Sequence, residues 1–579
     1  MSLVINFFIL LQVVILPLIF YTPAKDHFIV KDVIFHVISF SIVLFYFAGL
    51  FINKTSGKRL GSIYVLGITA FLLILVLSFL NAAYWVLSAR VFLTYMFYCM
   101  TAVVVAQGVD SGTIKTVVMI RTIICASAIV ASYGILQYLG IDFLAWQTSF
   151  GQRPGATFGN PNFSAGYIML TLPLAVGVLV EGFVQKKRLG GTNIFMLVCA
   201  VLIAAYFFIT RTRGAWLAFI SGSVVVFFVY CVVYKKWRVA VLAGLVFCVL
   251  LTSMVLYGKK VFGNTDASVV ERVFKWRTAM EMVRSNPLTG IGLGNLKVNF
   301  ALYQARVRDK AGFKLRGTSE SNVHNDYLQL AAEAGIPGLM GYLVMFSAVY
   351  IGVLHKLVSK ESKKTVVAQN KFGLWFSLAA VVMFNLYSFN NFPLSIVPTG
   401  FIVFVLIGIL VSDRAYCDIT GDVAGNKKDM ADRNTGFIGA GIAVITIFFA
   451  VFYGLPQIRA EVHRSNGDGY RNLGDYNSAA KEYLRALKLD YYRSEFTAYD
   501  LGMAYVKLGD YRSAIKAFET SVNLRNYGEV YNDIGNCYYL LGNNVLAAKN
   551  WEVALKLYLP NEEDQQQVLL NLARVKPKK

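Results

Sequence analysis

Long apolar segments separated by short polar ones run through the chain as far as residue 455. Each apolar segment is long enough to cross about 30 Å of hydrocarbon as a helix. We predict thirteen such helices, at residues 3–21, 29–52, 61–80, 87–106, 116–139, 164–184, 193–210, 214–234, 238–257, 336–354, 372–389, 394–412 and 437–455. The pattern therefore predicts an all-α, polytopic membrane protein of about 12–13 spans.

After residue 455 the pattern changes to a repeat of small and aromatic residues. Three sets recur: Gly467, Tyr470, Gly474, Tyr476, Ala479, Tyr483, Ala486; Gly502, Tyr505, Gly509, Tyr511, Ala514, Phe518, Ser521; and Gly535, Tyr538, Gly542, Ala547, Trp551, Ala554. Their spacing of 35 and then 33 residues resembles the paired helices of tetratricopeptide repeats. We expect three repeats and a capping helix near 563–575, forming a short solenoid that binds a protein partner.

Charge indicates how the spans are oriented. The net charge is +22, and many Lys and Arg residues fall in loops on one side: Lys54, Lys58, Arg59; Lys186, Lys187, Arg188; Lys235, Lys236, Arg238; Lys356, Lys360, Lys363 and Lys364. This distribution predicts a cytoplasmic N-terminus, and it makes nucleic-acid binding an unnecessary explanation of the charge. We therefore expect N-terminal spans over 1–257, an extracytoplasmic loop at 258–335, further spans over 336–455 and extracytoplasmic repeats at 456–579. The seven cysteines show no metal-ligand spacing.

The most suggestive polar stretch covers residues 321–338. Ser321 or Asn322 is expected to cap a helix that ends at Gly335 and Pro337. His324 would then lie in the first turn, where the positive helix end keeps an imidazole neutral and attracts anions such as phosphate. The alternative is a histidine that only caps the helix.

Several arginines lie near the predicted outer ends of spans. Arg211 and Arg213 are placed between two apolar segments, where guanidinium groups are costly unless they reach the interface or line a polar cavity. Arg272 begins an amphipathic stretch and shares a helix face with Lys275 or Trp276. A phosphate-binding cavity and simple anchoring at the membrane surface both fit these residues, and we assign Trp276 to the second role.

Two glycine-rich loops complete the candidate region. Residues 286–295 follow no predicted strand, so we interpret them as a tight turn that brings the backbone close to another part of the chain rather than as a dinucleotide site. Residues 153–162 hold Arg153, Asn160 and Asn162, which suit contacts with a sugar or pyrophosphate but also a turn. Glu333 is out of phase with His324 on a helix and is expected to support local structure.

Together these segments, over roughly residues 140–350, resemble the O-antigen ligase and polymerase family, with C-terminal repeats resembling those of some members. The resemblance rests on 153–162, Thr212-Arg213-Gly214, Arg272 with Trp276, 286–294, and His324-Asn325 through 333–338. It implies a metal-independent, cofactor-free, inverting glycosyltransferase in the bacterial cytoplasmic (inner) membrane. The donor would be an undecaprenyl-diphosphate-linked glycan, and the acceptor lipid A-core, another glycan or a protein hydroxyl.

The resemblance also implies roles for individual residues. His324 would activate the acceptor, while Arg213 and Arg272 would bind the diphosphate; Arg211, Arg153, Asn160, Asn162 and Asn325 would contact substrate. Which of Arg211 and Arg213 faces the diphosphate stays open, as do the sugar, the acceptor, the partner of the repeats and the oligomeric state. The rival function is a transporter or flippase for lipid-linked glycans with a docking module. It would require alternating access, and the spans show no internal symmetry of that kind.

Overall fold

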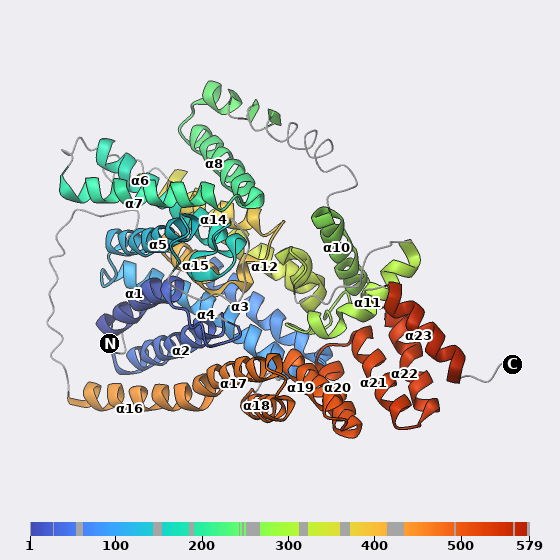
Figure 1. Ribbon diagram of the computed structural model, residues 1–579. Coiled ribbons are helices and arrows are strands. Elements are labelled where there is room, and N and C mark those ends of the chain that lie inside the picture. Colours follow the sequence, from blue (N-terminus) through green and yellow to red (C-terminus); the bar gives the residue numbers. More distant parts are fainter. Residues whose placement is uncertain are drawn as a thin grey trace.

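The computed structural model describes residues 2–26, 28–53, 62–142, 153–184, 190–242, 244–245, 248–249, 267–311, 322–358, 371–413, 433–490, 494–557, 559 and 562–575. Within these ranges every regular element is a helix (Figure 1). The part that precedes the repeats contains α1 (Ser2–Leu18), α2 (Phe28–Asn53), α3 (Ser62–Leu77), η1 (Ser78–Asn81), α4 (Trp85–Asp110), α5 (Thr116–Tyr138), η2 (Ala156–Phe158), α6 (Pro161–Val184), α7 (Gly191–Ile209), α8 (Arg213–Val233), α10 (Ala267–Ser285), α11 (Leu296–Ala311), α12 (Asp326–Val358), α14 (Lys371–Tyr387), η3 (Pro393–Ser395), α15 (Val397–Val411) and α16 (Arg433–Phe449).

The predicted membrane spans are largely confirmed. Among the described residues, nine helices are long and apolar enough to cross a membrane, and three shorter apolar helices, Ser2–Leu18, Gly373–Tyr387 and Val397–Val411, coincide with further predicted spans. These account for twelve of the thirteen. The remaining span, 238–257, lies mostly outside the described residues, as do the basic loops at 54–59, 186–188 and 360–364. The chain is a multi-pass membrane protein.

Helix α15 lies in the middle of the membrane core. All of its residues from Val397 to Val411 are buried, as expected for a helix that is apolar on every side. It packs against α4 through two glycines: a Cβ at Gly400 would lie 2.5 Å from the Tyr98 ring, and one at Gly408 would lie 2.7 Å from the Ala102 carbonyl oxygen. Small residues thus allow these two helices to approach closely.

The C-terminal region is the predicted solenoid. A π-helical turn, η5 (Ala450–Gly454), joins α16 directly to the first repeat helix. The repeats pair α17 (Leu455–Asn472) with α18 (Tyr476–Leu489), α19 (Glu495–Lys507) with α20 (Tyr511–Leu524), and α21 (Gly528–Leu540) with α22 (Asn544–Leu557); α23 (Glu562–Val575) follows as the capping helix.

The repeated glycines explain the packing within each helix pair. A Cβ at Gly467 would lie 2.5 Å from the Tyr483 ring, and one at Gly502 would lie 2.4 Å from the Phe518 ring. The third repeat is built the same way, with Gly535 facing Trp551. Each aromatic ring therefore fills the space that its partner glycine leaves open, as the repeat pattern predicted.

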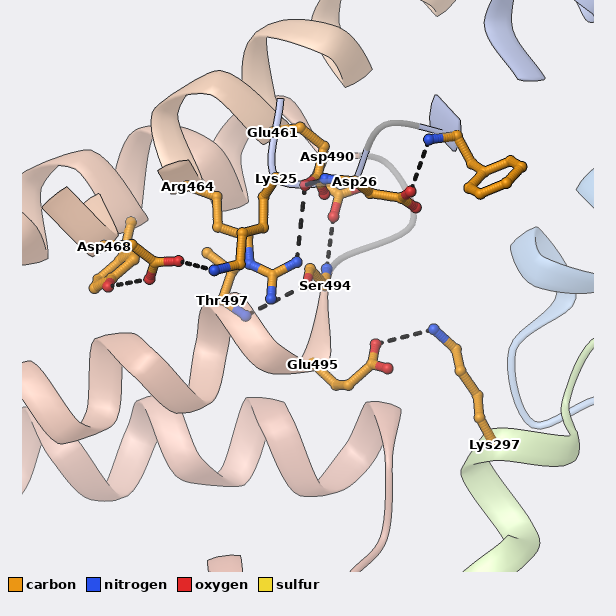
Figure 2. A network of polar contacts seen from close by, with 12 residues as sticks. Lys25, Asp26, Lys297, Glu461, Arg464, Asp468, Asp490, Ser494, Glu495 and Thr497 are labelled. Carbon is orange, nitrogen blue, oxygen red and sulfur yellow. Dashed lines mark hydrogen bonds and ion pairs between the residues drawn. The ribbon is translucent and has the colours of Figure 1, made fainter. Parts of the chain in front are cut away.

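The repeats contact the membrane part of the chain through charged residues (Figure 2). Lys25 lies 2.7 Å from Asp468, the Asp26 backbone N–H donates to Glu461, and Lys297 of α11 lies 2.9 Å from Glu495. Arg525 also pairs with Glu495, at 3.2 Å. We call the contacts of Lys25, Asp26 and Lys297 with Glu461, Asp468 and Glu495 the docking interface. It places α11 beside α20 and α22 (Figure 1).

Candidate active site

The segment around His324 differs from the predicted helix start. Helix α12 begins at Asp326, and Asn325 caps it by accepting a hydrogen bond from the Leu328 N–H at 3.0 Å. The expected cap at Asn322 is therefore wrong, and Ser321 lies outside the described residues. His324 precedes the cap with a φ of 56°, so it is not in the first turn. The local pattern offered several polar residues as caps, and Asn325, which directly follows His324, is the one whose side chain bonds to the first turn of the helix.

The His324 imidazole is nevertheless held neutral. Its Nδ1 is buried without a hydrogen-bond partner among the described residues, and its ring lies 4.9 Å from the Phe392 ring, edge to face. Burial is the largest effect that lowers the pKa of His324 from 6.5 to about 4, and the positive charges of Lys275 and Arg272 act in the same direction. The imidazole is thus neutral near pH 7, because of burial and neighbouring cations rather than a helix end.

Helix α10 carries two of these neighbouring groups. Lys275 is buried and lies 2.7 Å from Glu271, one turn earlier on the helix. Trp276, predicted to anchor the chain at the membrane surface, packs on a small core that includes Ala279 and Met282. Residues of α11 and of the start of α12 complete this core, which the local pattern does not show. The anchoring role of Trp276 stays a prediction.

Arg272 reaches across to the end of α14. Its Nη1 donates a hydrogen bond to the Asn390 side-chain oxygen. The Asn390 Nδ2 in turn faces the start of α8, where a Cβ at Gly214 would lie only 2.9 Å from it. One asparagine therefore connects Arg272 with the turn that begins at Arg213.

Arg153 lies close to Arg213 but is bound by the protein itself. Its Nε donates to the Thr210 carbonyl oxygen at 2.9 Å, and its Nη2 donates to the Asn162 and Thr212 side chains at 3.0 and 3.1 Å. Burial lowers the pKa of the Arg153 guanidinium, and the positive charge of Arg213 adds to this effect. Arg153 thus joins the loop before α6 to the turn between α7 and α8.

The other predicted substrate contacts also make local bonds. The Asn160 side chain accepts from the Asn162 backbone N–H at 2.9 Å, and the Asn325 amide donates to the Phe389 carbonyl oxygen at 3.0 Å. Arg211 is exposed and has a φ of 49°, at the end of α7. Arg213 is exposed as well, at the first residue of α8. Substrate contacts by all of these residues stay predictions.

Residues 387–392, at the end of α14, connect the pieces. The Tyr387 hydroxyl donates to the Asn162 carbonyl oxygen at 3.0 Å, and the Asn391 amide donates to the Tyr387 hydroxyl at 2.5 Å. We call these residues the 387–392 segment. The sequence analysis did not single out this segment. Two consecutive asparagines, Asn390 and Asn391, were a usable signal, because side-chain amides in a short loop between membrane spans need hydrogen-bond partners.

The 286–295 loop fixes the second half of the site as predicted. The Ile291 and Gly292 N–H groups donate to the Ala332 and Glu333 carbonyl oxygens at 2.9 and 3.0 Å, and the Gly294 N–H donates to a Glu333 side-chain oxygen at 2.7 Å. Helix α12 is kinked at Gly335, whose φ is 71°. The loop and the kink thus hold each other, and Glu333 has the expected supporting role.

Comparisons with known proteins agree with the resemblance seen in the sequence. Residues 197–343 match the O-antigen ligase family, and residues 467–492 and 493–559 match tetratricopeptide repeats. A search of curated proteins finds no match. Similar solved structures include the first repeat domain of Spaghetti (RPAP3) bound to an HSP90 peptide, with 22% identity over 21% of this chain and 94% of that one, TM-score 0.19. The second repeat domain of human RPAP3 in complex with an HSP70 peptide is 25% identical over 21% of this chain and 99% of that one, with a TM-score of 0.19.

Proposed function

We propose that this chain, which carries an O-antigen ligase domain followed by tetratricopeptide repeats, is an inverting glycosyltransferase of the bacterial cytoplasmic membrane. It moves a glycan from an undecaprenyl-diphosphate carrier to an acceptor hydroxyl. The family match supports a membrane enzyme of the glycan ligase or polymerase kind. The finer proposal depends on one observation, a neutral imidazole held beside fixed cations at one end of the helix bundle.

The proposed reaction follows from these groups. His324 accepts the proton of the acceptor hydroxyl as its oxygen attacks the anomeric carbon. The bond from that carbon to the diphosphate oxygen breaks, and its electron pair leaves with the lipid diphosphate. The guanidinium groups of Arg213 and Arg272 stabilise the charge that develops there. Because attack and departure occur on opposite faces, the anomeric configuration inverts.

The proposal includes a topology. The N-terminus is cytoplasmic, the site and the repeats of 456–579 lie outside the cytoplasm, and residues 258–335 form the large periplasmic catalytic loop. Tetratricopeptide repeats often bind proteins, so we propose that they engage an acceptor or an assembly partner. Single cysteines labelled by an impermeant thiol reagent in intact cells test this arrangement: a cysteine at exposed Val545 is expected to react and one at exposed Trp237 is not.

The decisive experiment is transfer by purified protein from a lipid-linked donor to candidate acceptors. His324→Ala is expected to lower the transfer rate by about 10²–10⁴, the usual scale for an acid–base group. His355→Ala is the matched control, since His355 is exposed near the other end of α12. Near-normal transfer by the His324 variant would remove this residue from the mechanism, and no transfer by the unmodified protein would contradict the enzyme.

A further inference from the structure

Asn390 contacts two parts of the site that come from distant stretches of the chain. Its side-chain oxygen accepts from Arg272 of α10, and its nitrogen faces Gly214 in the first turn of α8. It belongs to neither helix, because it follows the end of α14. It also lies beyond residues 197–343, which contain both of its neighbours and match the ligase family.

We propose that Asn390 is a positioning residue that holds the Arg272 guanidinium beside the start of α8, so that Arg272 and Arg213 face the same diphosphate. This inference rests on the proposed function. Asn390 is not assigned a contact with substrate; it acts through Arg272.

The amide suits this role because it is neutral. A carboxylate in the same place would also accept from Arg272, but it would cancel the positive charge that a diphosphate needs. An amide oxygen fixes the direction of the guanidinium and leaves its charge in place. The Asn390 nitrogen then takes up the space beside Gly214, where a larger residue would displace it.

The backbone around Asn390 is held on both sides. The Phe389 carbonyl oxygen accepts from the Asn325 amide, next to His324. Asn391 is 6% exposed, donates to Tyr387 and accepts from the Phe392 N–H at 3.1 Å. These bonds hold the backbone of Asn390 in place, so its side chain can fix the position of the Arg272 guanidinium relative to the His324 imidazole.

Comparing Asn390→Asp with Asn390→Ala separates positioning from a merely structural role. Asp has the same shape and keeps an acceptor for Arg272, whereas Ala loses the acceptor but leaves the charge. The readouts are kcat and the KM for the lipid-linked donor, inhibition of transfer by inorganic pyrophosphate, and the melting temperature of the full-length protein.

We expect Asn390→Asp to raise the donor KM and the pyrophosphate inhibition constant by about tenfold or more, because its carboxylate keeps the bond to Arg272 but cancels the positive charge that would bind the diphosphate. Asn390→Ala should mainly lower kcat, with a smaller change in pyrophosphate inhibition. Both should melt close to the unmodified protein, since Asn390 is only partly buried. Trp551→Ala is the structural comparison, because this ring is buried inside the third repeat; it is expected to lower the melting temperature without weakening pyrophosphate inhibition.

Two outcomes overturn the inference. One is an Asn390→Asp enzyme whose donor KM and pyrophosphate inhibition match those of the unmodified protein. The other is loss of activity that parallels loss of thermal stability in both variants. Either result leaves the proposed function intact if the unmodified protein transfers glycan. Absence of transfer by that protein would instead contradict the proposed function itself.

Discussion

The docking interface and the candidate site both use cations, but they hold them differently. At the docking interface Lys25 and Lys297 lie 2.7 and 2.9 Å from the carboxylates of Asp468 and Glu495 (Figure 2). At the site Arg272 and Arg153 donate instead to amide, hydroxyl and carbonyl oxygens. A carboxylate cancels the charge that it binds, whereas a neutral oxygen only orients it. The difference separates cations whose charge a carboxylate cancels from cations such as Arg272, whose charge would remain for an anionic ligand.

Two groups sharpen this comparison. Burial alone would raise the pKa of Glu495, but Lys297 and Arg525 hold it below its ordinary value, so the interface is a paired cluster. Lys275 is the intermediate case, because it pairs with Glu271 and yet its charge still lowers the pKa of His324. Pairing within the site is thus incomplete, and positive charge remains around the imidazole.

Among the cations of the two regions, the largest effect on transfer is expected from removing Arg272. Arg272→Ala should lower transfer by about 10²–10³, the usual cost of one group that stabilises developing charge, with little change in melting temperature. Arg284→Ala is the matched control on the same helix, since its side chain is 73% exposed. Steady-state transfer rates measure both variants. Equal rates for the Arg272 variant and the unmodified protein would show that Arg272 is structural only.

At the docking interface, substitution is expected to lower stability, whereas at the site it is expected to lower the transfer rate. Glu495→Ala leaves the Arg525 guanidinium buried without this carboxylate, which should cost about 3–5 kcal/mol in the stability of the repeats. Urea unfolding of the full-length protein, followed by limited proteolysis of the repeats, measures this loss. Glu495→Gln keeps the shape and isolates the charge. Unchanged unfolding in both variants would contradict a paired cluster.

A third prediction concerns pH. Because the pKa of His324 is lowered to about 4, the imidazole is neutral above that pH, and kcat/KM should fall through this group only near pH 4 rather than near 6.5. The shift also makes the folded protein lose stability as the pH falls from 6.5 toward 4. Lys275→Met removes a positive charge near His324, so it should raise the pKa of His324 and move the acidic fall of kcat/KM to higher pH. If kcat/KM of the unmodified protein instead fell with a midpoint near pH 6.5, the result would be inconsistent with a buried imidazole beside cations.

The smallest effect is expected from Lys297→Ala. The Lys297 side chain is 20% exposed, and partly exposed ion pairs contribute about 1 kcal/mol or less. Glu495 keeps Arg525 as a partner in this variant. Melting in low and high salt measures the change, which should shrink as salt rises. A loss as large as that of Glu495→Ala would mean that Lys297 carries the interface alone.

The correct and incorrect predictions divide by how far their causes reach along the chain. The spans, the 286–295 turn and the supporting role of Glu333 were predictable from neighbouring residues. The packing of Trp276 and the bonds of Arg153 to Thr210 and Thr212 were not, because they depend on segments far away in sequence. The cap of α12 is local, but it was assigned to Ser321 or Asn322 instead of Asn325. The pair Asn390-Asn391 was visible in the sequence as two amides in a short loop, but the contacts of Asn390 with Arg272 and Gly214 were not, because both partners are distant in sequence.

The sequence by itself determined twelve of the described membrane helices and the three repeats. Long apolar runs and the regular spacing of glycine and aromatic residues are local patterns, and the same contacts recur in each span or helix pair. Only the tertiary structure decided that α10 and Phe392 lie near His324, and that Asn390 lies between Arg272 and the start of α8. Their meeting depends on how separate helices pack, which no local period encodes. The cations near the neutral His324 imidazole are therefore placed by the assembled bundle and not by any local pattern.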